Sequence, residues 1–70
     1  MRKKMTLGDK LRAVKDNVRL FELYCEELAN RQIRYSKSGC LVNGKRAGIN
    51  AFNNAQKYAA QYIYDKQFNP

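Results

Sequence analysis

Residues 40–47 read CLVNGKRA, and the Asn43-Gly44 pair at their centre decides the fold that we expect. This pair is the strongest short-range signal for a two-residue β-hairpin turn, because Asn and Gly accept the positive φ angles of a type I′ turn. In such a turn Val42 faces Lys45 across the two strands, and further pairs follow outward. The stretch therefore predicts an antiparallel hairpin.

The hairpin is expected to have two different faces, because successive side chains of a strand point to opposite sides. Cys40, Val42 and Ala47 would share an apolar face. An isolated hairpin is marginal in water, so a helix must cover this face. Arg46 would point to the outer face, and Arg34 is expected to join it there. The outer face is therefore predicted to be basic.

The segment before the hairpin has the period of an amphipathic helix. Thr6 and Asp9 have the spacing of a capping box at its start. Apolar residues then recur at alternating steps of four and three residues: Leu7, Leu11, Val14, Val18, Phe21, Cys25 and Leu28. We expect one long helix from about residue 7 to about residue 31.

Two further elements follow from the rest of the chain. Beyond Gln32 the apolar period changes from about 3.6 to two residues, which predicts a short strand around Tyr35 and a turn at 37–39. Asn50 is a good N-cap, so a second helix is expected from about residue 51 to about residue 66. These elements predict an α+β fold in the order αββ(β)α. A long N-terminal helix and a C-terminal helix would pack on one face of a small antiparallel hairpin or three-stranded sheet.

The chain is short enough for one domain at most, because a chain of this size buries only about 60% of its unfolded surface. We expect a single small domain over residues 1–70. Residues 1–5 are expected to form a basic, flexible N-terminus, and residues 67–70 a frayed C-terminus. No run approaches the roughly 18 apolar residues of a membrane span, and no apolar signal-peptide core follows the basic start. We therefore expect a cytoplasmic protein in which Cys25 and Cys40 are reduced and buried.

The residue inventory argues against an enzyme. The chain has no histidine, so it lacks an imidazole base and the Ser-His or Cys-His couples of common catalytic sites. Two cysteines cannot supply the four ligands of a structural zinc site. Glu22, Glu26 and Glu27 cluster on the expected first helix, where a solvated face is the simpler interpretation. We therefore expect no catalytic residue, no metal site and no cofactor.

Positive charge is concentrated near the hairpin. The chain carries 14 Lys+Arg against 6 Asp+Glu, a formal net charge of +8. Five bases and no acid lie between residues 31 and 46: Arg31, Arg34, Lys37, Lys45 and Arg46. Such side chains neutralise phosphates and release counterions, so we expect them to contact a nucleic-acid backbone. Tyr35 is expected to stack on an unpaired base, which favours RNA slightly over DNA.

The first helix offers a competing interaction surface. A helix of about 25 residues is about 37 Å long and one of about 16 residues is about 24 Å long, so the shorter helix leaves part of the apolar stripe uncovered. The uncovered residues would be Leu7, Leu11, Val14 and Val18. Such a strip predicts a homodimer through this helix. Alternatively, it predicts a phage- or plasmid-type module that binds a host protein, for example at an acidic surface, and inhibits or regulates it.

Overall fold

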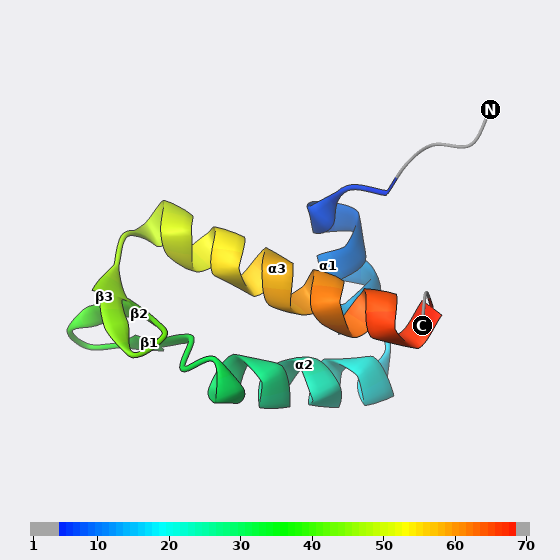
Figure 1. The fold of residues 1–70 in the computed structure, drawn as a ribbon, viewed down its shortest axis with the longest axis horizontal. Coiled ribbons are helices and arrows are strands. Elements are labelled where there is room, and N and C mark those ends of the chain that lie inside the picture. Colours follow the sequence, from blue (N-terminus) through cyan, green and yellow to red (C-terminus); the bar gives the residue numbers. More distant parts are fainter. Residues whose placement is uncertain (1–4, 69–70) are drawn as a thin grey trace.

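The computed structural model describes residues 5–68, over which the chain forms three helices and a three-stranded antiparallel sheet (Figure 1). In chain order the elements are α1 (Leu7–Lys15), α2 (Val18–Asn30), β1 (Arg34–Ser36), β2 (Gly39–Val42), β3 (Lys45–Ala47) and α3 (Ile49–Phe68). The predicted α+β class is confirmed. Most of the expected flexible N-terminus, residues 1–4, lies outside the described residues, as do residues 69–70.

The segment predicted as one long helix is divided at Asn17. This residue is the N-cap of α2, and its side-chain oxygen accepts a hydrogen bond of 3.0 Å from the Leu20 N–H. Asn satisfies a free N–H at a helix start better than it continues a helix, so the break has a local cause. The prediction of one helix is therefore wrong. The predicted capping box at the start of α1 is present, with two hydrogen bonds of 3.1 Å between Thr6 and Asp9.

The break changes which side chains of α2 are buried. Leu20 and Tyr24 face the interior, whereas Val18, Phe21 and Cys25 of the predicted stripe are exposed. A stripe with steps of four and three stays on one face only while the helix is continuous. Because the helix is interrupted at Asn17, the side chains of α2 no longer continue the face that begins on α1. Cys25 is consequently a free, exposed thiol. The expectation that it is buried is wrong.

The longest helix is the last one, and it organises the fold. α3 has 20 residues, which corresponds to about 30 Å. α1 and α2 pack against its C-terminal half, and the sheet packs against its N-terminal half (Figure 1). The helix begins at Ile49, and the Gly48 carbonyl accepts a hydrogen bond of 2.9 Å from the Phe52 N–H. Asn50, the predicted N-cap, therefore lies in the first turn, and the helix continues through Phe68, where fraying is expected from the sequence.

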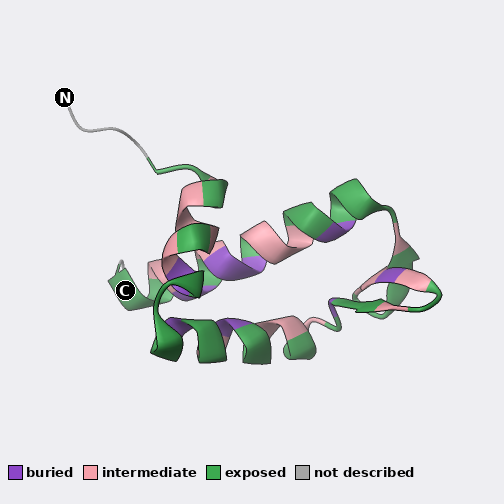
Figure 2. Ribbon diagram, turned by 180° about the vertical axis from the view of Figure 1, so that it is seen from behind, coloured by how far each residue is buried: buried purple, intermediate pink, exposed green. Residues whose placement is uncertain are grey.

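The buried side chains form two clusters along α3, on the inner surfaces of the elements (Figure 2). The helical cluster joins the three helices and consists of Val14, Leu20, Tyr24, Ala59, Ala60 and Ile63. The sheet cluster is smaller and consists of Ile33, Cys40 and Phe52. Ala59 and Ala60 are fully buried, and their small side chains allow α1 and α2 to approach α3 closely. Leu28 packs against both clusters and so connects them.

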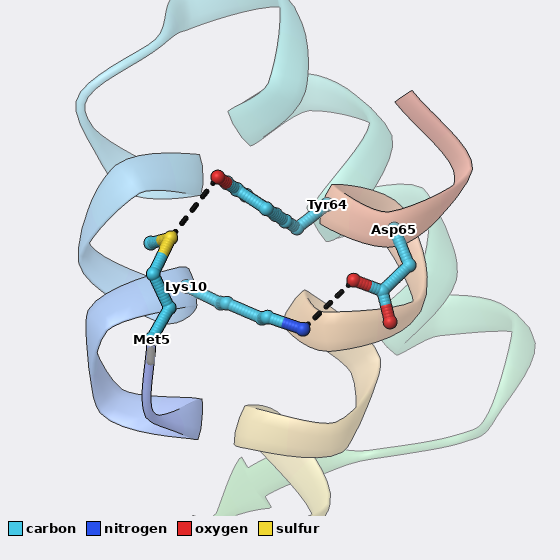
Figure 3. Close-up of polar contacts among 4 residues, drawn as sticks. All are labelled: Met5, Lys10, Tyr64 and Asp65. Carbon is cyan, nitrogen blue, oxygen red and sulfur yellow. Dashed lines mark hydrogen bonds and ion pairs between the residues drawn. The ribbon is translucent and has the colours of Figure 1, made fainter. Parts of the chain in front are cut away.

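Polar contacts fasten α1 to the C-terminal end of α3 (Figure 3). Lys10 Nζ lies 2.8 Å from Asp65 Oδ1, and both side chains are partly exposed. The Tyr64 hydroxyl donates a hydrogen bond of 3.1 Å to the Met5 sulfur. The Lys10 ammonium also lies 5.6 Å from the centre of the Tyr64 ring. Together these contacts hold the start of α1 against the last turns of α3.

Candidate nucleic-acid interface

The sheet has the strand order β1-β2-β3, and the register of its hairpin is the one expected from the sequence. The pairs between β2 and β3 are Val42 with Lys45, Leu41 with Arg46 and Cys40 with Ala47. Asn43 and Gly44 have φ angles of 56° and 78°, and a type I′ turn requires two such positive values. The predicted hairpin is therefore confirmed, and its register determines which side chains share a face.

The face of the sheet that points away from α3 carries two arginines in one row. Arg34 of β1 pairs with Leu41 of β2, and Leu41 pairs with Arg46 of β3. We call these three residues the outer row. Neighbouring strands are about 4.8 Å apart, so the two arginine backbones are about 10 Å apart on the same face. Both arginines are exposed and Leu41 is half-buried. Because this separation is close to the Debye length in about 0.1 M salt, one anion at the row is attracted by both charges.

Tyr35 lies on the opposite face of the sheet from the outer row. It pairs with Cys40, which is buried, and its ring centre is 6.5 Å from that of Phe52 on α3. The side chain is nevertheless 74% exposed. The predicted stacking residue and its neighbour Arg34 therefore point to different sides of the sheet, because adjacent residues of a strand alternate.

The two turns of the sheet lie at opposite ends of the strands. The turn between β2 and β3 is docked on the end of α2. The Asn43 N–H donates to the Arg31 carbonyl at 3.0 Å, and the Gly44 N–H donates to the Gln32 carbonyl at 3.2 Å. Lys37 is in the other turn, between β1 and β2, where its side chain is exposed. The hairpin tip that the sequence predicts is thus held by the helix, and the turn with Lys37 is the one farther from α2.

Arg31 differs from the other predicted phosphate-contact residues because its charge has a partner. Its Nε lies 2.6 Å from Glu27 Oε2, and its guanidinium carbon lies 5.3 Å from the centre of the Tyr62 ring. Arg31 thus links the end of α2 to α3. Glu27 and Arg31 are four residues apart, a spacing that indicates a possible ion pair on a helix. No comparable sequence signal indicates Tyr62.

The other four predicted cations are exposed and have no carboxylate partner among residues 5–68. They are Arg34, Lys37, Lys45 and Arg46. The cause lies in the sequence, because no acid occurs between Glu27 and Asp65. Among residues 5–68, no carboxylate is paired with these four side chains to reduce their positive potential, which only water and dissolved salt then screen.

The residues predicted to form a protein-interaction strip do not lie on one surface. Leu7, Leu11 and Val14 belong to α1, which packs against α3. Val14 is 0% exposed, so it cannot contact a partner. Val18 is exposed, but it is the first residue of α2. The break at Asn17 therefore removes the continuous strip on which the predicted helix-1 homodimer and the host-protein interface depend.

Within residues 5–68, no three His, Cys, Asp or Glu side chains are grouped so that they could hold a metal ion. The helices in this range lack the combination of length and apolar character needed to cross a membrane. No protein-family model, curated protein or solved structure matches the chain.

Proposed function

We propose that the chain is a non-enzymatic nucleic-acid-binding protein whose sheet contacts the phosphate backbone. The observation that carries this proposal is the outer row, in which Arg34 and Arg46 lie on one exposed face, with no carboxylate partner in residues 5–68. Lys37, in the exposed turn between β1 and β2, extends the positive surface beyond the row. Lys45 is exposed as well, but its pairing with Val42 places it on the opposite face of the sheet from Arg46. Arginine suits this role because the guanidinium stays charged and can bind a phosphate through two N–H groups.

Binding would be driven by charge neutralisation. A phosphate strand across the outer row replaces the repulsion between two arginines with two attractive contacts, and counterions leave the nucleic acid. Leu41, at the centre of the row, offers an apolar surface to a sugar. Phosphate contacts carry no sequence information, so we expect affinity that tolerates different sequences and falls with salt.

A preference for RNA is the finer part of this proposal, and it depends on Tyr35. This residue is on the edge strand β1 and largely exposed, but it points away from the outer row. It could therefore stack only on a base that wraps around the edge of the sheet. If Tyr35→Ala weakens binding to single-stranded RNA and leaves duplex DNA unchanged, such stacking takes place.

The proposal is tested by fluorescence anisotropy with labelled, mixed-sequence RNA and DNA at several salt concentrations. Three phosphate contacts, by Arg34, Arg46 and Lys37, predict a slope of log affinity against log salt of about −2 to −3. The double variant Arg34→Ala/Arg46→Ala should weaken binding about tenfold or more at low salt and make the slope shallower by about two.

Arg19→Ala is the matched control for the arginine variants. Arg19 is an exposed arginine at the start of α2, about 20 Å along the helix from the sheet. Its removal should change affinity much less than either outer-row variant. Absence of binding to both RNA and DNA at low salt contradicts the proposal, and so does an equal loss in the Arg19 variant.

A further inference from the structure

Arg34 of the outer row also lines a groove where the end of α2 meets β1. The groove has a volume of about 590 Å³, and the other residues that line it are Cys25, Leu28, Ala29, Gln32 and Ile33. Sites for small ligands usually have volumes of about 300–1,000 Å³ and largely apolar walls. A ligand whose anionic part is bound by Arg34 therefore has a recess of suitable size and character beside it.

Gln32, which lines this groove, has a backbone conformation that residues other than glycine rarely adopt. Its φ is 52°, and it closes α2. Its N–H donates to the Ala29 carbonyl at 3.0 Å, and the Ile33 N–H donates to the Leu28 carbonyl at 2.9 Å. These two hydrogen bonds form a Schellman motif, in which glycine is the usual residue at the left-handed position. The chain thus carries a long polar side chain where the backbone favours glycine.

The side-chain amide of Gln32 is available to a ligand. Gln32 is exposed, the end of its side chain lies near Gly44, and its amide makes no hydrogen bond within residues 5–68. An amide presents a donor and an acceptor side by side, and each nucleobase presents a matching pair on its Watson–Crick edge. Residues in unfavourable backbone conformations cluster at ligand contacts. The position and the chemistry of Gln32 therefore both indicate a contact to a base.

We propose that the groove binds one unpaired base of a single strand whose phosphate is bound by Arg34, with the Gln32 amide on the edge of that base. One sugar joins a base to its phosphate, so a phosphate on Arg34 brings the attached base to the neighbouring groove. In a duplex the base is stacked and its Watson–Crick edge is occupied, so it cannot enter. This inference rests on the proposed function and names its ligand class, a strand with unpaired bases.

The charge around the groove agrees with such a ligand. Arg34 has no carboxylate partner in residues 5–68, and none of the residues that line the groove is acidic. The site is also separate from the predicted stacking residue, because Tyr35 points to the other side of the sheet from Arg34. A contact to a base in the groove therefore does not require Tyr35.

The proposal is tested with two labelled single strands of equal length, one of mixed-sequence DNA and one in which every base is replaced by hydrogen. Both strands offer the same phosphates to the outer row, and only the first offers a base to the groove. In fluorescence anisotropy with the full chain, the intact strand should bind about fivefold or more tightly than the abasic strand.

Two variants locate the base. Ala29→Leu narrows the groove, and Gln32→Gly removes the amide. Each should weaken binding of the intact strand about threefold or more and leave binding of the abasic strand unchanged. Both variants should fold, as far-UV circular dichroism would show. Ala29 is exposed and leucine is a good helix former, and glycine accepts the φ of Gln32.

Asn30→Leu is the matched control for Ala29→Leu. Asn30 is the next residue of α2 and is also exposed, but it does not line the groove. Its substitution should leave the affinity for both strands unchanged.

The outcomes separate this inference from the proposed function. Equal affinity of the wild-type chain for the two strands overturns the groove as a base site and leaves phosphate binding in place. If Ala29→Leu or Gln32→Gly keeps the full preference for the intact strand, the base is bound elsewhere and the inference is wrong. Absence of binding to both strands at low salt overturns the proposed function and this inference together.

Discussion

The two halves of α3 are covered in different ways. One end of the molecule holds the larger buried cluster, and the other end holds the unpaired positive charges. The C-terminal half is enclosed by α1 and α2, which bury the helical cluster, and the partly buried Lys10 there is paired with Asp65. The N-terminal half is covered on one side by a sheet of short strands with a smaller cluster. At that end Arg34 and Arg46 have no carboxylate partner in residues 5–68.

The two ends differ because a helix bundle and a small sheet can bury different numbers of faces. Three helices can turn their apolar faces toward one another, whereas a three-stranded sheet packed on one helix leaves its other face in water. The exposed face can carry unpaired charges because water solvates them. Substitutions at the helical end should therefore change folding, and substitutions on the outer row should change binding.

The largest expected effect is seen when leucine is replaced by alanine in the helical cluster and, for comparison, on the outer row. Leu20→Ala opens a cavity in the helical cluster and should lower the free energy of unfolding by about 2–5 kcal/mol. Leu41→Ala removes a half-buried side chain from the outer row, and its effect should be below about 1 kcal/mol. Urea denaturation followed by far-UV circular dichroism measures both. Equal losses would mean that stability is not concentrated at the helical end.

The turn between β2 and β3 should show the next largest effect. Gly44 has a φ of 78°, at which any L side chain is strained, whereas the Gln32 side-chain end nearest an added Cβ can move aside. Gly44→Ala should lower the free energy of unfolding by about 1–2 kcal/mol. Gly48→Ala is the control, because nothing lies near its added Cβ; its change should stay within about 0.5 kcal/mol. A Gly44 variant as stable as wild type by urea denaturation contradicts the positive φ of this turn.

The Lys10–Asp65 ion pair should make a smaller contribution. Asp65→Asn should lower the free energy of unfolding by about 0.5–1 kcal/mol, because partly exposed ion pairs are screened by water. The loss should shrink at high salt. Glu26→Gln removes an exposed carboxylate with no ion pair among residues 5–68 and serves as the control. A loss that does not depend on salt would indicate a packing effect instead of a charge effect.

The smallest predicted effect concerns Tyr24 of the helical cluster at high pH. Burial raises the pKa of its phenol above the ordinary value of 10.0, and the adjacent Cys25 thiolate raises the pKa further. The folded chain therefore keeps a proton that the unfolded chain releases, and the free energy of unfolding falls as pH rises from 10 toward the folded-state pKa. Tyr24→Phe should make this decline less steep in urea titrations. An equally steep decline in the Tyr24→Phe variant would contradict the burial of this phenol.

Local signals predicted the elements better than they predicted the packing. The Asn43-Gly44 pair indicated the turn and the register of the hairpin, because a two-residue turn requires particular φ angles whatever the rest of the chain does. Thr6 and Asp9 indicated the start of α1 for a similar local reason. Asn17 carried a usable signal for the break, since Asn is a strong N-cap. The apolar period that continues past it favoured one helix and concealed the break.

The candidate interface was only partly predictable. The sequence shows that Arg34 and Arg46 lie in an acid-free segment, and alternation along the strands placed them together. The opposite orientation of Tyr35 follows from the same alternation. The partner of Arg31 on α3 did not follow from the sequence, because Tyr62 is far from it along the chain and no local rule connects them.

By itself, the sequence determined the hairpin, its register and the concentration of positive charge, because these depend on backbone preferences and neighbouring residues. Only the tertiary structure decided that α3 is the central element and that Val14 is buried. It also decided that the turn at Asn43 is docked on the end of α2. These features depend on side chains from distant segments that fill the same space, and their fit is a property of the folded chain as a whole.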